Sequence, residues 1–158
     1  MLQRIQTVYL ALAAIAMILI FFFPFALFQS EFIYSRFYVY GLVDMVPGGA
    51  NNMNFIYALP LILADIGVVV LTVGAIFRYK NRPSQIKLAN AAFILTIIFI
   101  AAVFFLYGHF LEKRFSTAPI WSEGIGVYFP LIAMVFIMLA IRAIRRDENL
   151  VRSTDRLR

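Results

Sequence analysis

The sequence contains no cysteine and only one histidine, and each shortage excludes a kind of chemistry. Without cysteine the chain can form no disulfide, thiolate nucleophile, cysteine-ligated zinc site or dithiol relay. A single histidine excludes a haem or metal site built from several histidines of this chain. The sequence also has no P-loop, glycine-rich dinucleotide turn, GxSxG or HExxH motif. We therefore expect no cofactor, and a non-enzymatic protein rather than an enzyme.

Charged residues are scarce as well, at 14% of the chain against about 25% in a typical soluble domain. Hydrophobic residues make up 63% of the chain, and the mean hydropathy is +0.89. A soluble domain of 158 residues could not cover this much apolar surface, so we predict an integral membrane protein. No repeat or linker interrupts the chain, which indicates one domain over residues 1–158.

The stretch from Phe55 to Phe77 has one ionisable group, Asp65, close to its centre. As a helix its 23 residues would cover roughly 35 Å, enough to cross a hydrocarbon core of about 30 Å. A carboxylate at the middle of a bilayer costs at least ~2.5 kcal/mol. Asp65 is therefore the intramembrane residue of greatest interest.

Three further apolar stretches are long enough to cross a membrane, and all four predict an all-α membrane protein, a four-transmembrane-helix bundle. The expected bounds of these three are Thr7 to Phe28, Leu88 to Leu111 and Ile125 to Ile141. Pro24 is expected to kink the last turn of the first helix. Pro83 is expected to end the helix before it, with Ser84 as the N-cap of the next.

The first outer loop contains the strongest strand signal of the chain. From Glu31 to Tyr40, Tyr34 and Tyr38 fall on one side of an extended chain, and Phe37 and Val39 fall on the other. The turn-forming sequence PGGANN follows at residues 47–52. We predict a small β-hairpin in this loop. The alternative is a loop whose tyrosines lie at the level of the lipid headgroups.

The C-terminal residues 142–158 contain neither glycine nor proline, so we predict that the fourth helix continues into water as a helical tail. Four arginines of this tail fall along one helical face: Arg142, Arg145, Arg152 and Arg156.

Positive charge is distributed unevenly between the two sides of the predicted bundle. Four spans place both termini on one side, which leaves Arg36, Lys113 and Arg114 on the opposite side. The other basic residues are Arg4, Arg78, Lys80, Arg82, Lys87, Arg142, Arg145, Arg146, Arg152, Arg156 and Arg158. By the positive-inside rule the termini are cytoplasmic. We expect the basic residues to contact anionic lipids or a partner protein, and we expect no nucleic acid.

Asp65 needs a partner or a proton, and the centres of the other three spans are apolar, with Thr96 the nearest polar residue. Three interpretations remain open. The acid is neutral and hydrogen-bonded inside the bundle, or it meets a cation of another subunit, or it belongs to a proton or ion pathway.

His109 and Glu112 lie three residues apart at the outer boundary and are weak candidates for a site there. A metal would need a third ligand, such as Asp44 or Glu123, and two solvated boundary residues are the simpler interpretation, so we predict no metal. Separately, Gly67 and Gly74 fall seven residues apart in the second span and indicate close packing of that helix on a neighbour.

Three segments together carry a resemblance to a known family: MLQRIQTVYL at the start, KNRPSQIKL in the basic loop and RAIRRDENLVRSTDRLR at the end. They resemble an uncharacterised family of small bacterial four-span membrane proteins, described as a domain of unknown function. The resemblance covers essentially the whole chain. It implies a bundle in the bacterial cytoplasmic (inner) membrane and implies no activity.

We hypothesise that the chain is a non-enzymatic scaffold or accessory subunit of a larger membrane complex, associating with other membrane subunits or with itself. The first alternative is a small proton- or ion-coupled transporter or channel that uses Asp65. The second is a lipid- or quinone-linked membrane enzyme that uses His109 and Glu112.

Overall fold

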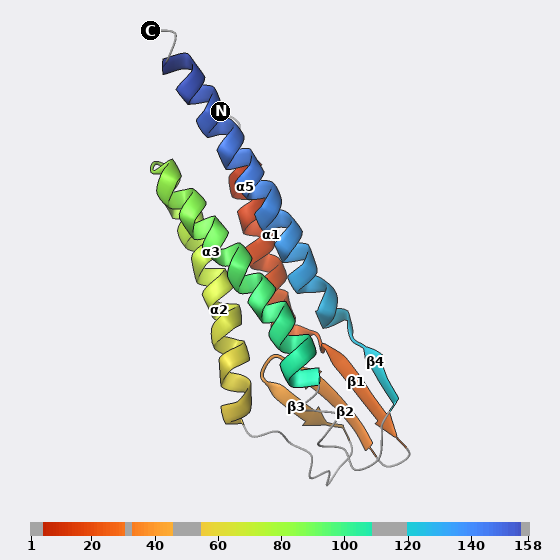
Figure 1. Cartoon of the computed structure of the whole chain (residues 1–158). Helices are drawn as coiled ribbons and strands as arrows, with labels where there is room; N and C mark the ends of the chain where they lie inside the picture. The colour runs from red at the N-terminus through yellow and green to blue at the C-terminus, as the bar shows by residue number, and fades with distance from the viewer. Residues whose placement is uncertain (1–4, 31–32, 46–54, 109–119, 156–158) are drawn as a thin grey trace.

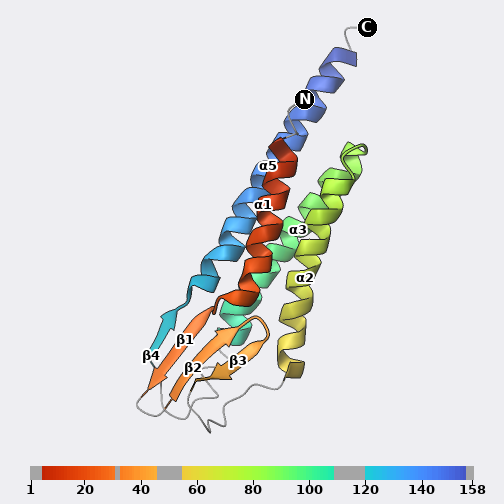
Figure 2. The same cartoon turned by 180° about the vertical axis from the view of Figure 1, so that it is seen from behind.

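The computed structural model describes residues 5–30, 33–45, 55–108 and 120–155 of the chain. Within these residues four long helices lie side by side and a small β-sheet covers one end of the bundle (Figure 1). The start of the first helix and the end of the last lie at the other end, as both views show (Figures 1 and 2).

The long helices are α1 (Ile5–Leu19), α2 (Phe55–Phe77), α3 (Arg82–Ala101) and α5 (Tyr128–Asp155). A 3₁₀ turn, Ile20–Phe22, extends α1, and another, Ile125–Val127, precedes α5. A π-helical segment, Ala102–Gly108, continues α3. Because α1 and α3 each pack against both α2 and α5, the four helices form a closed ring.

All four helices are long and apolar enough to cross a membrane. Their outward faces carry large hydrophobic side chains: Leu63 is 64% exposed and Val70 is 62% exposed. Soluble proteins rarely leave so much continuous apolar surface open to water. The described part of the chain is therefore a helical bundle suited to a lipid environment, which agrees with the prediction from composition.

Small residues recur among the larger side chains of the bundle interior, and they let the helices approach closely. Ala58, Ala92 and Ala133 have no exposed surface. A methyl group added at Gly67 of α2 would lie 2.9 Å from Cδ2 of Leu95 in α3. The predicted close packing at this glycine is confirmed, and its neighbour is α3.

The sheet has four antiparallel strands in the order β3-β2-β1-β4. These are β1 (Ala26–Ser30), β2 (Ile33–Tyr38), β3 (Gly41–Asp44) and β4 (Ile120–Glu123). Gly41 has a φ of 132°, which side-chain-bearing residues rarely adopt, and it completes the turn between β2 and β3. β4 follows α3 in the chain and pairs with β1, where Gln29 lies opposite Ile120.

Aromatic rings join the sheet to the bundle. The ring of Phe25 lies 5.9 Å from Phe37 of β2 and 6.0 Å from Phe99 of α3. Phe37 also stacks on Tyr107 at 5.8 Å. The inner face of the sheet is thus fixed against the end of α3, which makes the sheet and the helices one packed unit.

The first helix is shorter than expected. Phe28 was predicted to end the span, but it lies in β1, and the helical segment ends at Phe22. The reason is Pro24: the residue before a proline avoids helical geometry, and Phe23 is extended, with φ −120° and ψ 134°. The apolar residues that follow are buried beneath the sheet instead of crossing the bundle.

The start of α3 also corrects the prediction. The helix begins at Arg82, ahead of the apolar span predicted from Leu88, so Arg82 and Lys87 lie within its first turns, whereas Arg78 and Lys80 precede it. Ser84 is not the N-cap. Asn81 is, and its side chain accepts a hydrogen bond of 3.2 Å from the Ser84 amide. Pro83 lies in the first turn, where a missing amide hydrogen costs little.

The other elements agree more closely with expectation. The bounds of α2 are those predicted, and α5 continues as a helical tail to Asp155. The predicted strand is β2, but it belongs to a four-stranded sheet and not to an isolated hairpin, so the all-α description is too narrow. The turn-forming sequence at 47–52 lies outside the described residues.

Candidate functional site

Asp65 lies on the inward face of α2 and has no exposed surface. The buried positions Ala58, Leu61, Asp65, Val68, Thr72 and Ala75 repeat with helical periodicity, which places them along one face directed into the bundle. Among the described residues, neither carboxyl oxygen of Asp65 has a hydrogen-bond partner. A cation of another subunit would have to penetrate the bundle to reach this group, so the geometry favours a role inside the chain.

Two threonines are buried in the same interior, and both hydroxyls are already used. Thr72 donates to the Val68 carbonyl at 2.8 Å, and Thr96 donates to the Ala92 carbonyl at 2.8 Å. Because Gly67 faces Leu95 across the two antiparallel helices, Thr96 lies within about one turn of the level of Asp65. Each hydroxyl oxygen retains a lone pair that could accept a proton donor.

Two glutamines extend this polar interior toward the basic end of the bundle, and the sequence analysis did not single them out. Gln6 of α1 is 2% exposed and Gln85 of α3 is not exposed. Within the described structure, the amide oxygens of both and the amide nitrogen of Gln85 lack partners. The available signal was periodicity: Gln85 precedes Ala89, Ala92, Thr96 and Phe99 at helical spacing.

The predicted basic surface lies at the end of the bundle away from the sheet (Figures 1 and 2). Six of its members are exposed there: Arg78, Lys80, Lys87, Arg142, Arg145 and Arg146. Arg82 instead donates to the carbonyl of Asp147 at 3.0 Å, which ties the start of α3 to α5. Arg152 lies in the last turns of α5, and Arg156 lies outside the described residues.

The weak outer-boundary candidates, His109 and Glu112, also lie outside the described residues. Of their possible third ligands, Asp44 accepts a hydrogen bond from the Ser35 hydroxyl, and Glu123 lies at the end of β4. Across the ranges that the structure describes, no three metal-ligating side chains come together.

The outer sheet face, defined here as Tyr34, Arg36, Tyr38 and Tyr40, points away from the bundle. Arg36 donates to the Tyr34 hydroxyl at 3.1 Å and lies over the Tyr34 ring, 5.5 Å from its centre. The hydrogen bond to Tyr34 raises the pKa of Arg36 further above its ordinary high value, and the guanidinium carries its full positive charge. The rings of Tyr38 and Tyr40 stack at 5.0 Å. This face is therefore an ordered aromatic surface around one positive charge.

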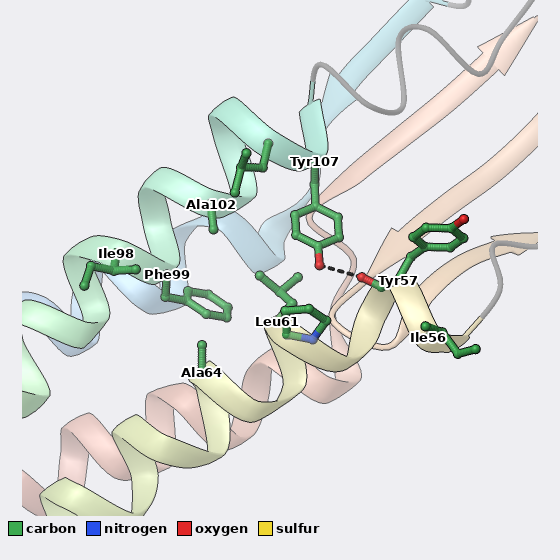
Figure 3. A pocket seen from close by; sticks show the side chains of 10 residues that line it. Ile56, Tyr57, Leu61, Ala64, Ile98, Phe99, Ala102 and Tyr107 are labelled. Carbon is green, nitrogen blue, oxygen red and sulfur yellow. Dashed lines mark hydrogen bonds between the residues drawn. The ribbon is translucent and has the colours of Figure 1, made fainter.

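A cleft of about 490 Å³ lies between α2 and α3 near the sheet. Its lining is almost wholly apolar and comes from Ile56, Tyr57, Pro60, Leu61, Ala64, Ile98, Phe99, Ala102, Leu106 and Tyr107. In Figure 3 the side chains of Leu61, Ala64 and Phe99 lie between the two helices. The Tyr107 hydroxyl donates to the Tyr57 carbonyl and closes one end of this α2–α3 cleft (Figure 3).

Comparison with known families gives a match over nearly the whole chain. Residues 2–157 fit the description "Domain of unknown function (DUF4293)". The chain belongs to this family. The resemblance noted in the sequence is thus confirmed, and the family description assigns no activity, organism or compartment. No curated protein matches the chain.

Proposed function

We propose that this DUF4293 chain is a non-enzymatic accessory or scaffold subunit of the bacterial cytoplasmic membrane, and that a partner protein docks on its outer sheet face. The observation that carries the proposal is the composition of that face. Tyrosine and arginine are the residues most enriched where protein interfaces concentrate their binding energy. Here Tyr34, Arg36 and Tyr38 share one side of β2, and Tyr40 of the following turn stacks on Tyr38.

The side chains of the outer sheet face are also held in place before any partner arrives. Arg36 is fixed by the Tyr34 hydroxyl and ring, and Tyr38 is stacked on Tyr40. Binding immobilises side chains at a cost of about 0.5–1.5 kcal/mol each, which prior ordering reduces. The face therefore combines the side chains of a binding surface with the rigidity that supports affinity.

The opposite end of the bundle supports a membrane orientation. The α2–α3 turn, the start of α1 and the projecting part of α5 lie together there, with exposed arginines and lysines (Figure 1). Under the positive-inside rule this end faces the cytoplasm, and the sheet faces outward. Each basic side chain close to an anionic leaflet contributes about 1 kcal/mol of attraction, so the same residues would hold anionic lipid headgroups.

The proposal predicts that binding of a partner protein depends on the outer sheet face. A tagged copy, expressed at its native level and purified in mild detergent, should retain a membrane protein in fixed stoichiometry. Changing Tyr38→Ser and Tyr40→Ser together should reduce that retention more than tenfold, because hot-spot side chains contribute on the order of 2 kcal/mol or more. Quantitative mass spectrometry of the eluates measures the loss.

The matched control is Tyr79→Ser, a tyrosine that is 46% exposed at the other end of the bundle. It should leave the partner bound. Recovery of the wild-type chain alone as a monomer would contradict the proposal, and so would equal loss of the partner in the control.

Asp65 supports a second candidate function, a small proton- or cation-coupled transporter. The observation in its favour is a fully buried acid without a partner in the described structure, in an interior that also contains Thr72, Thr96 and Gln85. Intramembrane acids are costly, and they mark ion and proton pathways. The partnerless amide groups toward the basic end would provide further polar positions along such a path.

This candidate predicts that Asp65→Asn abolishes transport. Wild-type protein in vesicles with an imposed proton or sodium gradient should show a flux above that of empty vesicles, and the variant should show none, since asparagine carries no exchangeable charge. A pH-sensitive or sodium-sensitive dye inside the vesicles reports the flux. Absence of flux in the wild type would eliminate the transporter.

A further inference from the structure

The α2–α3 cleft has a floor and a rim of different exposure. Leu61 and Phe99 form the floor and are 1% and 0% exposed. The rim residues Ile56 and Leu106 are 65% and 68% exposed and continue the outward apolar surface of the two helices. The cleft is thus an indentation of the surface that four apolar helices would present to a bilayer.

One wall of the cleft contains a proline within its helix, and the other wall includes a π-helical segment. Pro60 lies in the second turn of α2, where proline removes one helical hydrogen bond and crowds the preceding turn. The facing wall is formed by the end of α3 and the π-helical segment that begins at Ala102. Such π-helical turns are rare and occur frequently at functional sites. Pro60 and the π-helical residues Ala102, Leu106 and Tyr107 all line the cleft.

Fixed contacts set the positions of the two walls, so the cleft exists before any ligand enters. The Tyr107 hydroxyl is bonded to the Tyr57 carbonyl, and Tyr107 is stacked on Phe37 of the sheet. Phe99 of the floor packs on Phe25. Ligand sites are commonly preformed concave pockets of about 300–1,000 Å³ with apolar walls and few polar groups, and this cleft fits that description.

The chemistry of the lining restricts the occupant to a hydrocarbon chain. A water molecule in a cavity needs two to four polar partners, and the walls present almost none. The two tyrosines lie at the end nearest the sheet, and tyrosine rings at a membrane boundary sit at the level of the headgroups. A chain entering sideways from the bilayer would therefore lie along Ala64, Ile98 and Ala102, above Leu61 and Phe99, with its polar head beside Tyr57 and Tyr107.

We propose that the α2–α3 cleft binds one acyl chain of a membrane phospholipid, with the headgroup at the tyrosine end. The site lies within one chain and needs no contribution from the outer sheet face. This inference rests on the membrane location proposed above and goes beyond the docking function.

The experiment uses the full chain in vesicles that contain phosphatidylethanolamine with a diazirine in the middle of one acyl chain. After irradiation, adducts located by peptide mass spectrometry should concentrate on Ala64, Ile98 and Leu106, which line the cleft and are at least partly exposed. Outward positions of the same helices, such as Leu63 and Val70, should be labelled weakly. Changing Ala102→Phe should fill the cleft and lower this labelling about tenfold, because a buried ring has no room beside a bound chain.

The matched control is Ala101→Phe, which adds the same ring at an exposed neighbouring position and should leave the labelling unchanged. If Ala102→Phe fails to fold, Ala64→Leu narrows the cleft from the facing helix and should lower labelling in the same sense. Uniform labelling of all outward positions, or labelling unaffected by the cleft variants, would overturn the proposal. Labelling by a diazirine-bearing isoprenoid alone would overturn it as well. Partner retention on the outer sheet face is a separate measurement and distinguishes failure of the lipid site from failure of the docking function.

Discussion

Replacing Gly124 with alanine should strongly destabilise this protein. Among the glycines whose surroundings the structure gives, Gly124 is the one at which an added methyl group should destabilise the fold most. The added carbon would lie 2.1 Å from the Pro24 carbonyl oxygen and 2.8 Å from its carbon, which is far inside contact distance. These are backbone atoms, and the Gly124 amide is held to the Phe25 carbonyl at 2.8 Å, so neither segment can move aside cheaply. We expect a destabilisation of about 3 kcal/mol, at the upper end for overpacking.

The expected change is a fall of roughly 10 °C in the apparent melting temperature, measured at one scan rate in detergent. Gly124 has φ −87° and ψ 160°, a conformation that alanine also adopts, so the effect would be steric and not conformational. The matched control is Gly74→Ala in α2, where the new carbon meets Leu88 Cδ1 at an ordinary 3.9 Å. That variant should be unchanged or slightly stabilised, since alanine favours a helix over glycine. If the Gly124→Ala protein melted at the same temperature as the wild type, the close contact between Gly124 and the Pro24 backbone would be refuted.

The contact at Gly124 joins two distant segments and could not be predicted from the sequence, but several local elements could. The bounds of α2 follow from hydropathy because the segment is apolar apart from Asp65 and Thr72, and no proline or charge interrupts its last turns. The strand β2 follows from alternation: Phe37 is buried, and Tyr34 and Tyr38 are only partly so. Patterns of this kind depend only on residues that are close in sequence, so they can be read without knowing the fold.

Pairing between distant segments could not be predicted in the same way. β1 reads ALFQS and continues the apolar run of the first helix without a change in composition, so hydropathy assigns it to the membrane span. Only Pro24 indicates the break, through its effect on the residue before it. The partner strand β4 lies far along the chain, after α3, and nothing in its short sequence specifies β1.

Only part of the candidate site could be predicted, because the rest depends on contacts between distant segments. Asp65 stood out because a charge within an apolar helix is unusual, whatever its neighbours. The α2–α3 cleft and the buried glutamines depend on how two helices face each other, which spacing alone does not fix. Gln85 shows the difference, because its position on the buried face of α3 becomes evident only once Ala89 and Ala92 are known to face inward.

Asp65→Leu should stabilise the folded protein, although it replaces a residue with no exposed surface. Leucine has the same branching as aspartate, and in the described structure the carboxyl oxygens have no partner to lose. A buried polar group without a hydrogen bond destabilises the folded state by about 1–3 kcal/mol. An apolar replacement removes this penalty, although its larger volume adds a small cost. We expect a rise of about 5 °C in apparent melting temperature, measured as for Gly124→Ala.

Thr72→Val is the control that separates polarity from packing, because it lies on the same face of the same helix and removes a hydroxyl bonded to the Val68 carbonyl at 2.8 Å. Valine should leave stability unchanged or lower it by about 1 kcal/mol, since a satisfied hydrogen bond is lost. A gain in stability that is confined to Asp65→Leu would show that the acid weakens the fold where it stands. Residues that weaken a fold in this way concentrate at functional sites, so a stabilised variant that loses an ion flux shown by the wild type would assign Asp65 to transport. A loss of several kcal/mol in Asp65→Leu would instead show that the carboxyl group is bonded in the folded protein, and the interior would then be structural.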